Sequence, residues 1–325
     1  MDFVMRVFNE ECMCQNVKFL ELIYRITSTA TTRLDRQQPY KGSHSVDWVG
    51  YADDIEMFFE NVENLQKCIT LIDQIFKKFN LNINVSKTKT MIFNFNCNYE
   101  NLEQYPDTIS SLNGKPIENV KSFKYLGDII KCDESSTGDA ELELRIILAE
   151  SKFYELIKKL TNHHINLKTR VLILNSLVRS RLTYSCQTWN LTKRQSQRMN
   201  TVYTYMLRKM IKGGLQRYDE ENDFRYKICN EKLLEICNAE NVTDFVARQQ
   251  TKYLAHLVRQ SNTTLTKRLL FNENKYCKRG RRTETLCDKV LKITGTNRDQ
   301  FCKAALKREI GHGHPIGSGR RKLSK

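Results

Sequence analysis

The sequence has few residues that interrupt folded structure, and it has no long apolar run. It contains only 4 prolines in 325 residues, and 40% of its residues are hydrophobic. No apolar stretch approaches the roughly 20 residues that a membrane-spanning helix needs. Charged residues (Asp2, Arg6, Glu10 and Glu11) interrupt the apolar core that a secretory signal requires. We therefore expect an intracellular protein with two or three folded domains and no membrane partner.

The sequence also lacks any CxxC pair, and its 11 cysteines are an odd number scattered along a long chain. This is not the arrangement of a small, disulfide-rich secreted domain, so we expect most of the thiols to be reduced and buried. Zinc is a minor alternative. The residues that could bind it are separated by distances in sequence that match no compact structural zinc site: Cys277, Cys287, Cys302, His312 and His314.

The excess of positive over negative charge lies entirely in the later part of the chain. Residues 1–138 contain 15 Lys and Arg against 19 Asp and Glu, whereas the remaining residues contain 38 against 18. So long a basic region suits a polyanionic partner, and nucleic acid is the commonest one; an anionic membrane surface is the alternative. Basic clusters of this kind fit nuclear import as well as nucleic-acid contact, so we expect the nucleus rather than the cytoplasm.

One stretch in the acidic part requires a chemical explanation, namely residues 47–59, DWVGYADDIEMFF. Apolar residues lead up to Asp53 and Asp54 and resume directly after them, which predicts a tight hairpin with buried strands and an acidic tip. Adjacent carboxylates repel each other, so a fold that holds them together usually binds a cation, and Mg²⁺ is the natural one. The alternative is a surface turn that happens to contain two aspartates.

The periodicity of apolar residues predicts an α+β protein. In the first part we expect a helix near residue 3, a strand over 17–26, a polar loop over 27–45, the hairpin, and a helix from Asn61. The apolar face expected for that helix is Val62, Leu65, Ile69, Ile72, Phe76 and Phe79. Short strands are expected over 83–85 and 90–95, a hairpin turn at Asn113-Gly114, and a strand over 123–130. Helices are expected over 142–160, 167–178, 192–211, 231–239, 243–260, 283–292 and 298–310, with a disordered tail from Gly311.

In this order, the motifs resemble the palm and thumb of a reverse transcriptase, most closely the non-LTR retrotransposon type. Tyr51-Ala52-Asp53-Asp54 resembles the catalytic hairpin of that family. Residues 81–91, LNINVSKTKTM, resemble its fourth palm motif, and Phe123-Lys124-Tyr125-Leu126-Gly127 resembles its fifth. Arg279-Gly280-Arg281-Arg282 is similar to the basic carboxyl-terminal segment, although Arg282 stands where proline is usual.

The resemblance implies roles for these residues. Asp53 and Asp54 hold catalytic Mg²⁺ or Mn²⁺, and Tyr51 and Ala52 lie under the nucleotide. Lys87, in preference to Lys89, assists the departing pyrophosphate. The residues implied to contact the primer are Phe123, Tyr125, Leu126 and Gly127, and those implied to bind nucleic acid at the carboxyl-terminal end are Arg279, Arg281 and Arg282. The implied partners are an RNA template and a DNA primer.

The resemblance also implies a domain order: a truncated right-hand polymerase palm with an antiparallel sheet (1–138), a helical thumb (139–215) and a basic helical region with a disordered tail (216–325). The family has a further metal-binding aspartate on an earlier palm strand, and none of Asp2, Asp35 and Asp47 is expected to occupy such a strand. We therefore expect an incomplete reverse transcriptase whose fingers and first palm strand are a missing partner segment. The alternatives are an inactive nucleic-acid-binding remnant and a helical interaction protein with an accidental acidic turn.

Overall fold

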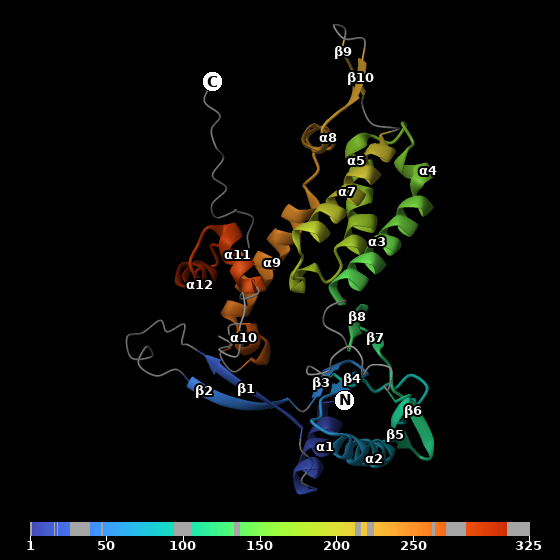
Figure 1. Ribbon diagram of the computed structural model, residues 1–325, viewed down its shortest axis with the longest axis vertical. Coiled ribbons are helices and arrows are strands. Elements are labelled where there is room, and N and C mark those ends of the chain that lie inside the picture. Colours follow the sequence, from blue (N-terminus) through green and yellow to red (C-terminus); the bar gives the residue numbers. More distant parts are fainter. Residues whose placement is uncertain are drawn as a thin grey trace. The chain divides into compact units, whose positions relative to one another are not determined.

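The structure is a computed structural model in which the chain divides into two compact units, at Thr137 and Gly138 (Figure 1). The residues that it describes are 2–15, 17, 19–26, 40–46, 48–93, 106–132, 137–211, 216–219, 224–261, 264–270 and 284–310. The first unit combines two long helices with short hairpins, and the second is built mainly from helices. The mixed α and β content that the sequence predicts is confirmed.

Two packed helices form the base of the first unit, α1 (Asp2–Cys14) and α2 (Val62–Lys78). The Asn61 side chain begins α2 by accepting a hydrogen bond from the Asn64 amide at 2.9 Å. Asn80, with φ of 57°, ends it in the left-handed conformation. The predicted apolar face of α2 was partly wrong, because Val62 and Phe79 are exposed. The buried core between the helices consists of Val4, Met5, Phe8, Cys12, Cys68, Leu71, Ile72, Ile75 and Phe76.

The strands of the first unit pair as separate antiparallel hairpins: β1 (Leu20–Ile26) with β2 (Tyr40–Val46), β3 (Trp48–Tyr51) with β4 (Asp54–Met57), β5 (Thr108–Leu112) with β6 (Lys115–Glu118), and β7 (Ser122–Tyr125) with β8 (Asp128–Lys131). Among the described residues these are four two-stranded sheets, not the single palm sheet that was expected. The polar loop predicted over 27–45 was also wrong in its last part, because residues 40–46 form β2. Residues 27–39 lie outside the described part of the chain.

The β5–β6 hairpin is fixed to α2 by side-chain hydrogen bonds. Gln66 donates to the Ser111 carbonyl at 2.8 Å and accepts from the Ser111 amide at 2.9 Å. Asn113 and Gly114 form the turn with φ of 52° and 74°, the type I′ geometry that an Asn-Gly pair predicts. The strand expected over 83–85 is not formed. Ile83 and Asn84 have no regular secondary structure, and Val85 begins a turn. Thr90 forms only an isolated bridge with Asn119, and residues 94 and 95 of the strand expected over 90–95 lie outside the described part of the chain.

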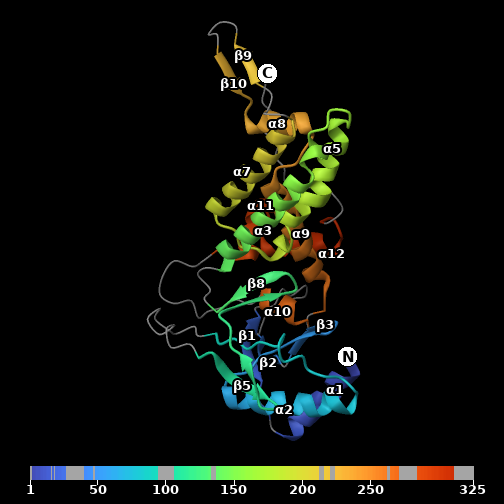
Figure 2. The ribbon, with the colours of Figure 1, turned by 90° about the vertical axis from the view of Figure 1, so that its right-hand side faces the viewer.

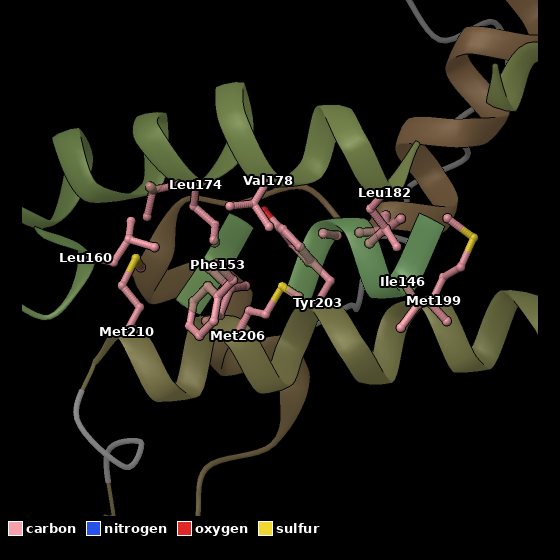
Figure 3. Packing of buried hydrophobic residues seen from close by; sticks show 14 of the residues in the cluster. Ile146, Phe153, Leu160, Leu174, Val178, Leu182, Met199, Tyr203, Met206 and Met210 are labelled. Carbon is pink, nitrogen blue, oxygen red and sulfur yellow. The ribbon is translucent and has the colours of Figure 1, made fainter. Parts of the chain in front are cut away.

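Helices α3 (Thr137–Glu155), α5 (Leu167–Ile173) and α7 (Lys193–Met210) surround much of the core of the second unit (Figure 2). The short α4 (Ile157–Leu160) joins α3 to α5 (Figure 1). The chain continues from α5 through a π-helical segment (Leu174–Arg179) into α6 (Ser180–Leu182). In the close view, Phe153 from α3, Leu174, Val178 and Leu182 from this continuous segment, and Met206 from α7 converge on one apolar layer (Figure 3). The expected helices over 167–178 and 192–211 are confirmed, whereas the one expected over 142–160 is divided at Leu156 into α3 and α4.

The remaining described elements are β9 (Gln216–Asp219), β10 (Phe224–Lys227), α8 (Asn230–Cys237), α9 (Val242–Arg259), α10 (Leu265–Leu270), α11 (Leu286–Thr294) and α12 (Arg298–Leu306), together with a 3-10 turn at Cys186–Thr188. A smaller core joins the last helices, where Leu254, Val258, Val290 and Phe301 pack together. Helix α10 and the β9–β10 hairpin were not predicted. Within the described residues, no helix is long and apolar enough to span a membrane.

Candidate active site

The acidic stretch folds as the β3–β4 hairpin, as predicted. Tyr51 pairs with Asp54, and Ala52 and Asp53 form the two-residue turn between them. Ala52 has φ of 56° whereas Asp53 does not have a positive φ, which is the pattern of a type II′ turn. A side chain other than glycine seldom adopts this conformation, and such positions cluster at functional sites. Tyr51 is 67% exposed, and both aspartates are exposed at the tip.

The two faces of the hairpin differ in what they contact. Because side chains alternate along a strand, Trp48, Ile55 and Met57 share one face and pack against the core of the first unit. A Cβ atom on Gly50 would lie 2.8 Å from the Trp48 ring, so any larger residue there would displace the indole. The expected burial of the flanking strands is therefore correct only for this face. On the other face, Tyr51 and Asp54 near the tip are exposed, whereas Glu56 is half-buried.

Glu56 lies on the same face as Asp54, two residues further along β4. Burial raises the pKa of the Glu56 carboxyl above its usual value. Burial, followed by the negative charges of Glu56 and Asp54, also raises the pKa of Tyr125. The Tyr125 hydroxyl is buried and has no hydrogen-bond partner among the described residues. The acidic face of the hairpin thus extends to a third carboxylate and to a phenol from another hairpin.

That phenol comes from the β7–β8 hairpin, which corrects a prediction. Residues 123–130 were expected to form one strand, but the chain reverses at Leu126 and Gly127, whose φ values are 47° and 93°. Tyr125 pairs with Asp128 across this turn. Phe123 and Tyr125 are half-buried on β7, and Leu126 is 40% exposed. The four residues to which the resemblance assigns primer contact therefore lie on the first strand and at the tip of a hairpin.

The lysine-bearing segment is held to the strand region that precedes this hairpin. The Thr90 amide donates to the Glu118 carbonyl at 3.0 Å, and the Val120 amide donates to the Thr90 carbonyl at 2.8 Å. The Thr90 hydroxyl also lies 3.3 Å from Oδ1 of Asn119. Leu81 and Ile83, earlier in the segment, pack on the helical core. The fourth-motif segment is therefore joined by backbone hydrogen bonds to the residues just before the fifth motif, a link that the sequence did not reveal.

The two candidate lysines have different surroundings. Asn84 caps the turn before them, and its carbonyl accepts hydrogen bonds from the Lys87 amide at 3.1 Å and the Thr88 amide at 2.9 Å. The Lys87 side chain is exposed, whereas Lys89 forms an ion pair with Glu118 at 2.5 Å. Lys89 and Glu118 also line a shallow depression of about 630 Å³ between this turn and β6. Lys87 is thus the more accessible of the two, as a group that meets a substrate must be.

The side chains at the hairpin tip determine which metal ion the site can hold. Asp53 and Asp54 are adjacent, exposed carboxylates, and a hard cation such as Mg²⁺ is commonly held by one or two carboxylates together with substrate phosphates. The described residues contain no group of three or more His, Cys, Asp or Glu side chains arranged to hold a metal ion. The hairpin therefore fits a cation whose remaining ligands come from water and substrate, and it does not form a complete protein cage.

Some predicted residues fall outside the described part of the chain. Arg279, Arg281 and Arg282 lie there, as do Asp47 and the tail from Gly311. Of the five residues considered for zinc, only Cys287 and Cys302 are described, and both are partly buried in the core of α9, α11 and α12. Sequence reasoning missed Glu56 as part of the acidic face. The period-2 alternation of a strand, which places Asp54 and Glu56 together, was the signal that could have identified it.

The comparison with protein families gives one match in this region. Residues 22–130 match the family model described as reverse transcriptase (RNA-dependent DNA polymerase). The matched range contains the acidic hairpin, the lysine-bearing segment and nearly all of the β7–β8 hairpin, and it supports a reverse transcriptase domain in this part of the chain. Domains of this family act on RNA and DNA and generally use divalent metal ions. No curated protein and no solved structure matches the chain.

Proposed function

We propose that the chain provides the palm hairpin and thumb of a reverse transcriptase of the non-LTR retrotransposon type. The observation that carries this proposal is the exposed Tyr51-Ala52-Asp53-Asp54 turn, which lies within the range that matches the reverse transcriptase family. In this proposal the chain is the carboxyl-terminal portion of such an enzyme, and a fingers and first-palm segment is its partner. The substrates are an RNA template, a DNA primer and deoxynucleoside triphosphates.

In the proposed mechanism, Asp53 and Asp54 hold the Mg²⁺ or Mn²⁺ that is needed for nucleotidyl transfer. Such an ion, when bound, activates the attacking hydroxyl and neutralises charge on the phosphates. The turn fixes the two carboxylates at the tip of a hairpin whose opposite face is packed on the core, so their position does not depend on flexible side-chain contacts. Tyr51 presents an exposed ring beside them for contact with sugar or base.

The neighbouring segments have supporting roles. Lys87 lies in a capped turn with its ammonium exposed, and it can bind the departing pyrophosphate or give it a proton. Phe123, Tyr125, Leu126 and Gly127 present the strand and tip of the β7–β8 hairpin to the primer. The domains proposed for residues 139–215 and 216–325, with Arg279, Arg281 and Arg282, supply basic surface for nucleic acid. The proposed location is the nucleus.

A second candidate function is a catalytically inactive, nucleic-acid-binding remnant of such an enzyme. The observation that favours it is the lack of a third metal ligand near Asp53 among the described residues. Two-metal chemistry requires ligands on both sides of the reacting phosphate. The two candidates share the basic surface and differ only in whether a primer is extended.

Primer extension on an RNA template distinguishes them. The full chain should extend a primer in Mg²⁺, alone or after addition of a polypeptide that supplies fingers and the first palm strand of a related enzyme. We expect Asp53→Asn to lower the rate by roughly 100-fold or more, since loss even of an outer-shell metal partner costs about 10–100-fold. Asp128→Asn, at the tip of the β7–β8 hairpin, is the matched control, and its extension rate should stay within about 3-fold of that of the wild-type chain.

Each outcome decides between the candidates. Extension that depends on Asp53 but not on Asp128 supports the active enzyme. A failure of the wild-type chain to extend the primer under both conditions, with binding of the primer and template retained, identifies the inactive remnant. Extension that persists in Asp53→Asn would show that the hairpin is not the site of the reaction.

A further inference from the structure

A cluster of three residues joins α3 and α7 on the surface of the helical unit. Tyr154 lies on α3, and Tyr205 and Lys209 lie one turn apart on α7. The Lys209 ammonium donates to the hydroxyl of Tyr154 at 3.3 Å and to that of Tyr205 at 3.2 Å. It also lies 4.7 Å from the centroid of the Tyr154 ring and 5.5 Å from that of the Tyr205 ring. We call these three residues the tyrosine–lysine cluster.

The aromatic rings of this cluster are exposed although their positions are fixed. Tyr154 and Tyr205 are each 46% exposed. The ring of Tyr154 packs edge-on against Phe153, with centroids 5.5 Å apart, and Phe153 is fully buried in the core. The two helices that carry the rings are also joined nearer their beginnings, where Gln195 bonds Asp139 at 2.7 Å and Arg198 bonds Glu143 at 2.8 Å. The rings therefore offer apolar surface to a ligand with little loss of side-chain entropy on binding.

The charge of α7 indicates what kind of ligand suits this surface. Residues 193–210 contain five Lys and Arg and no Asp or Glu. Hydrogen bonds from Tyr154 and then Lys209 lower the pKa of Tyr205. Bonds to the hydroxyls of Tyr205 and Tyr154 raise the pKa of Lys209, which therefore remains an ammonium ion at neutral pH. The carboxylate of Glu150 on α3 also acts on Tyr205, in the opposite direction. A lasting positive charge beside two aromatic faces is the chemistry that binds a phosphate and its neighbouring bases.

We propose that the tyrosine–lysine cluster binds unpaired RNA, with bases stacked on Tyr154 and Tyr205 and a phosphate held by Lys209. Stacking needs a base whose face is free, which excludes the paired bases of a duplex. The phenolic hydroxyls at the ring edges can bond the ribose 2′-hydroxyl, which is both donor and acceptor and is absent from DNA. The proposal rests on the proposed function, because an RNA template is single-stranded before it is copied.

Fluorescence anisotropy of a labelled oligouridylate of about 12 nucleotides tests this with the full chain. We expect Tyr154→Ala and Tyr205→Ala each to weaken binding by about 10-fold, since one base–aromatic stack contributes on that order. Lys209→Gln should lower the slope of log affinity against log salt by about 0.7, the loss of one phosphate contact to a single strand. The double variant Tyr154→Phe/Tyr205→Phe should retain stacking but lose any preference for oligouridylate over oligothymidylate.

Matched controls separate these effects from general ones. Tyr184→Ala removes a tyrosine that is 47% exposed elsewhere on the helical unit, and Lys78→Gln removes an exposed charge from the first unit. Both should bind oligouridylate within about 2-fold of the wild-type chain. Thermal unfolding of every variant identifies any that have lost the α3–α7 packing. If an alanine variant is unfolded, the corresponding single variant, Tyr154→Phe or Tyr205→Phe, is tested in its place for its preference for oligouridylate over oligothymidylate.

The proposal is overturned if the alanine variants bind oligouridylate as tightly as the wild-type chain. It is also overturned if they weaken binding of an RNA duplex or of oligothymidylate as much as that of the RNA strand. Asp53→Asn distinguishes this site from the proposed reaction, because it should abolish primer extension and leave oligouridylate binding unchanged. A chain that extends no primer but binds the RNA strand through Tyr154 and Tyr205 contradicts the enzymatic function alone.

Discussion

The β3–β4 and β7–β8 hairpins have the same strand pairing next to the turn and differ in the residues of the turn itself. In each, a tyrosine pairs with an aspartate across a two-residue turn, Tyr51 with Asp54 and Tyr125 with Asp128. The first turn contains Ala52 and Asp53, and the second contains Leu126 and Gly127. The tip of the first hairpin therefore carries two neighbouring carboxylates, and the second carries one. Strand pairing of the same kind therefore presents different chemical groups at the two turns, and only the first turn offers adjacent carboxylates.

The tyrosines of the two hairpins also differ in their exposure to solvent. Tyr51 is 67% exposed, whereas the Tyr125 hydroxyl is buried near Asp54 and Glu56 of the other hairpin. The Tyr51 ring is thus accessible, whereas the Tyr125 hydroxyl is shielded beside the acidic face. The resemblance implies nucleotide or primer contact for both residues, and this stays a prediction.

The largest stability difference between the hairpins is expected from exchanging alanine and glycine in their turns. Gly127→Ala places a Cβ atom on a residue with φ of 93° and should lower the free energy of unfolding by about 1–2 kcal/mol. Ala52→Gly, at φ of 56°, relieves strain and should not lower it. Urea unfolding followed by circular dichroism measures both. Equal destabilisation by the two substitutions would contradict the turn geometry described for them.

A smaller difference is expected when the two tyrosine hydroxyls are removed. Tyr125→Phe removes a buried hydroxyl that has no partner among the described residues, and it should raise the free energy of unfolding by up to about 1 kcal/mol. Tyr51→Phe removes a hydroxyl from an exposed ring and should change it by less than about 0.5 kcal/mol. Destabilisation by Tyr125→Phe would reveal a hydrogen bond from that hydroxyl in solution.

The smallest effect is a pH dependence that belongs to the acidic hairpin. Burial raises the pKa of Glu56 in the folded chain above 4.5, so the folded state binds more protons than the unfolded state between the two values. Stability is therefore lost as pH rises through this window. Glu56→Gln should be more stable than the wild-type chain at about pH 7, and the difference should shrink toward about pH 4. A difference that is constant with pH would exclude a raised pKa for Glu56.

Sequence patterns predicted the elements that depend on local rules. The Asn113-Gly114 turn requires positive φ at two residues, and the helix that begins after Thr192 has a capping box in which Thr192 and Gln195 bond each other's backbone. The acidic hairpin was predicted from apolar residues on both sides of two aspartates. Each of these signals lies within a few residues of the structure that it specifies, which is why it could be recognised.

The features that were missed depend on contacts between distant residues. Strand β2 contains Lys41, Gly42, Ser43, His44 and Ser45, and only its pairing with β1 makes it a strand. The turn at Leu126 and Gly127 was overlooked because apolar residues continue on both sides of it. The position of Tyr125 beside Glu56 follows from the packing of two hairpins, so no local pattern indicated it. The helical repeat of α2 was recognised, but which face packs on α1 was decided by the partner helix.

The central claim is that the β3–β4 hairpin binds a divalent cation and the β7–β8 hairpin does not. Paramagnetic broadening by Mn²⁺ in an amide NMR spectrum of the full chain tests it most directly. We predict that the resonances of residues 51–56 broaden first, and that this effect is lost in Asp53→Asn but retained in Asp128→Asn. Broadening that is absent from the β3–β4 hairpin, or that is equal at both hairpins, would contradict the account.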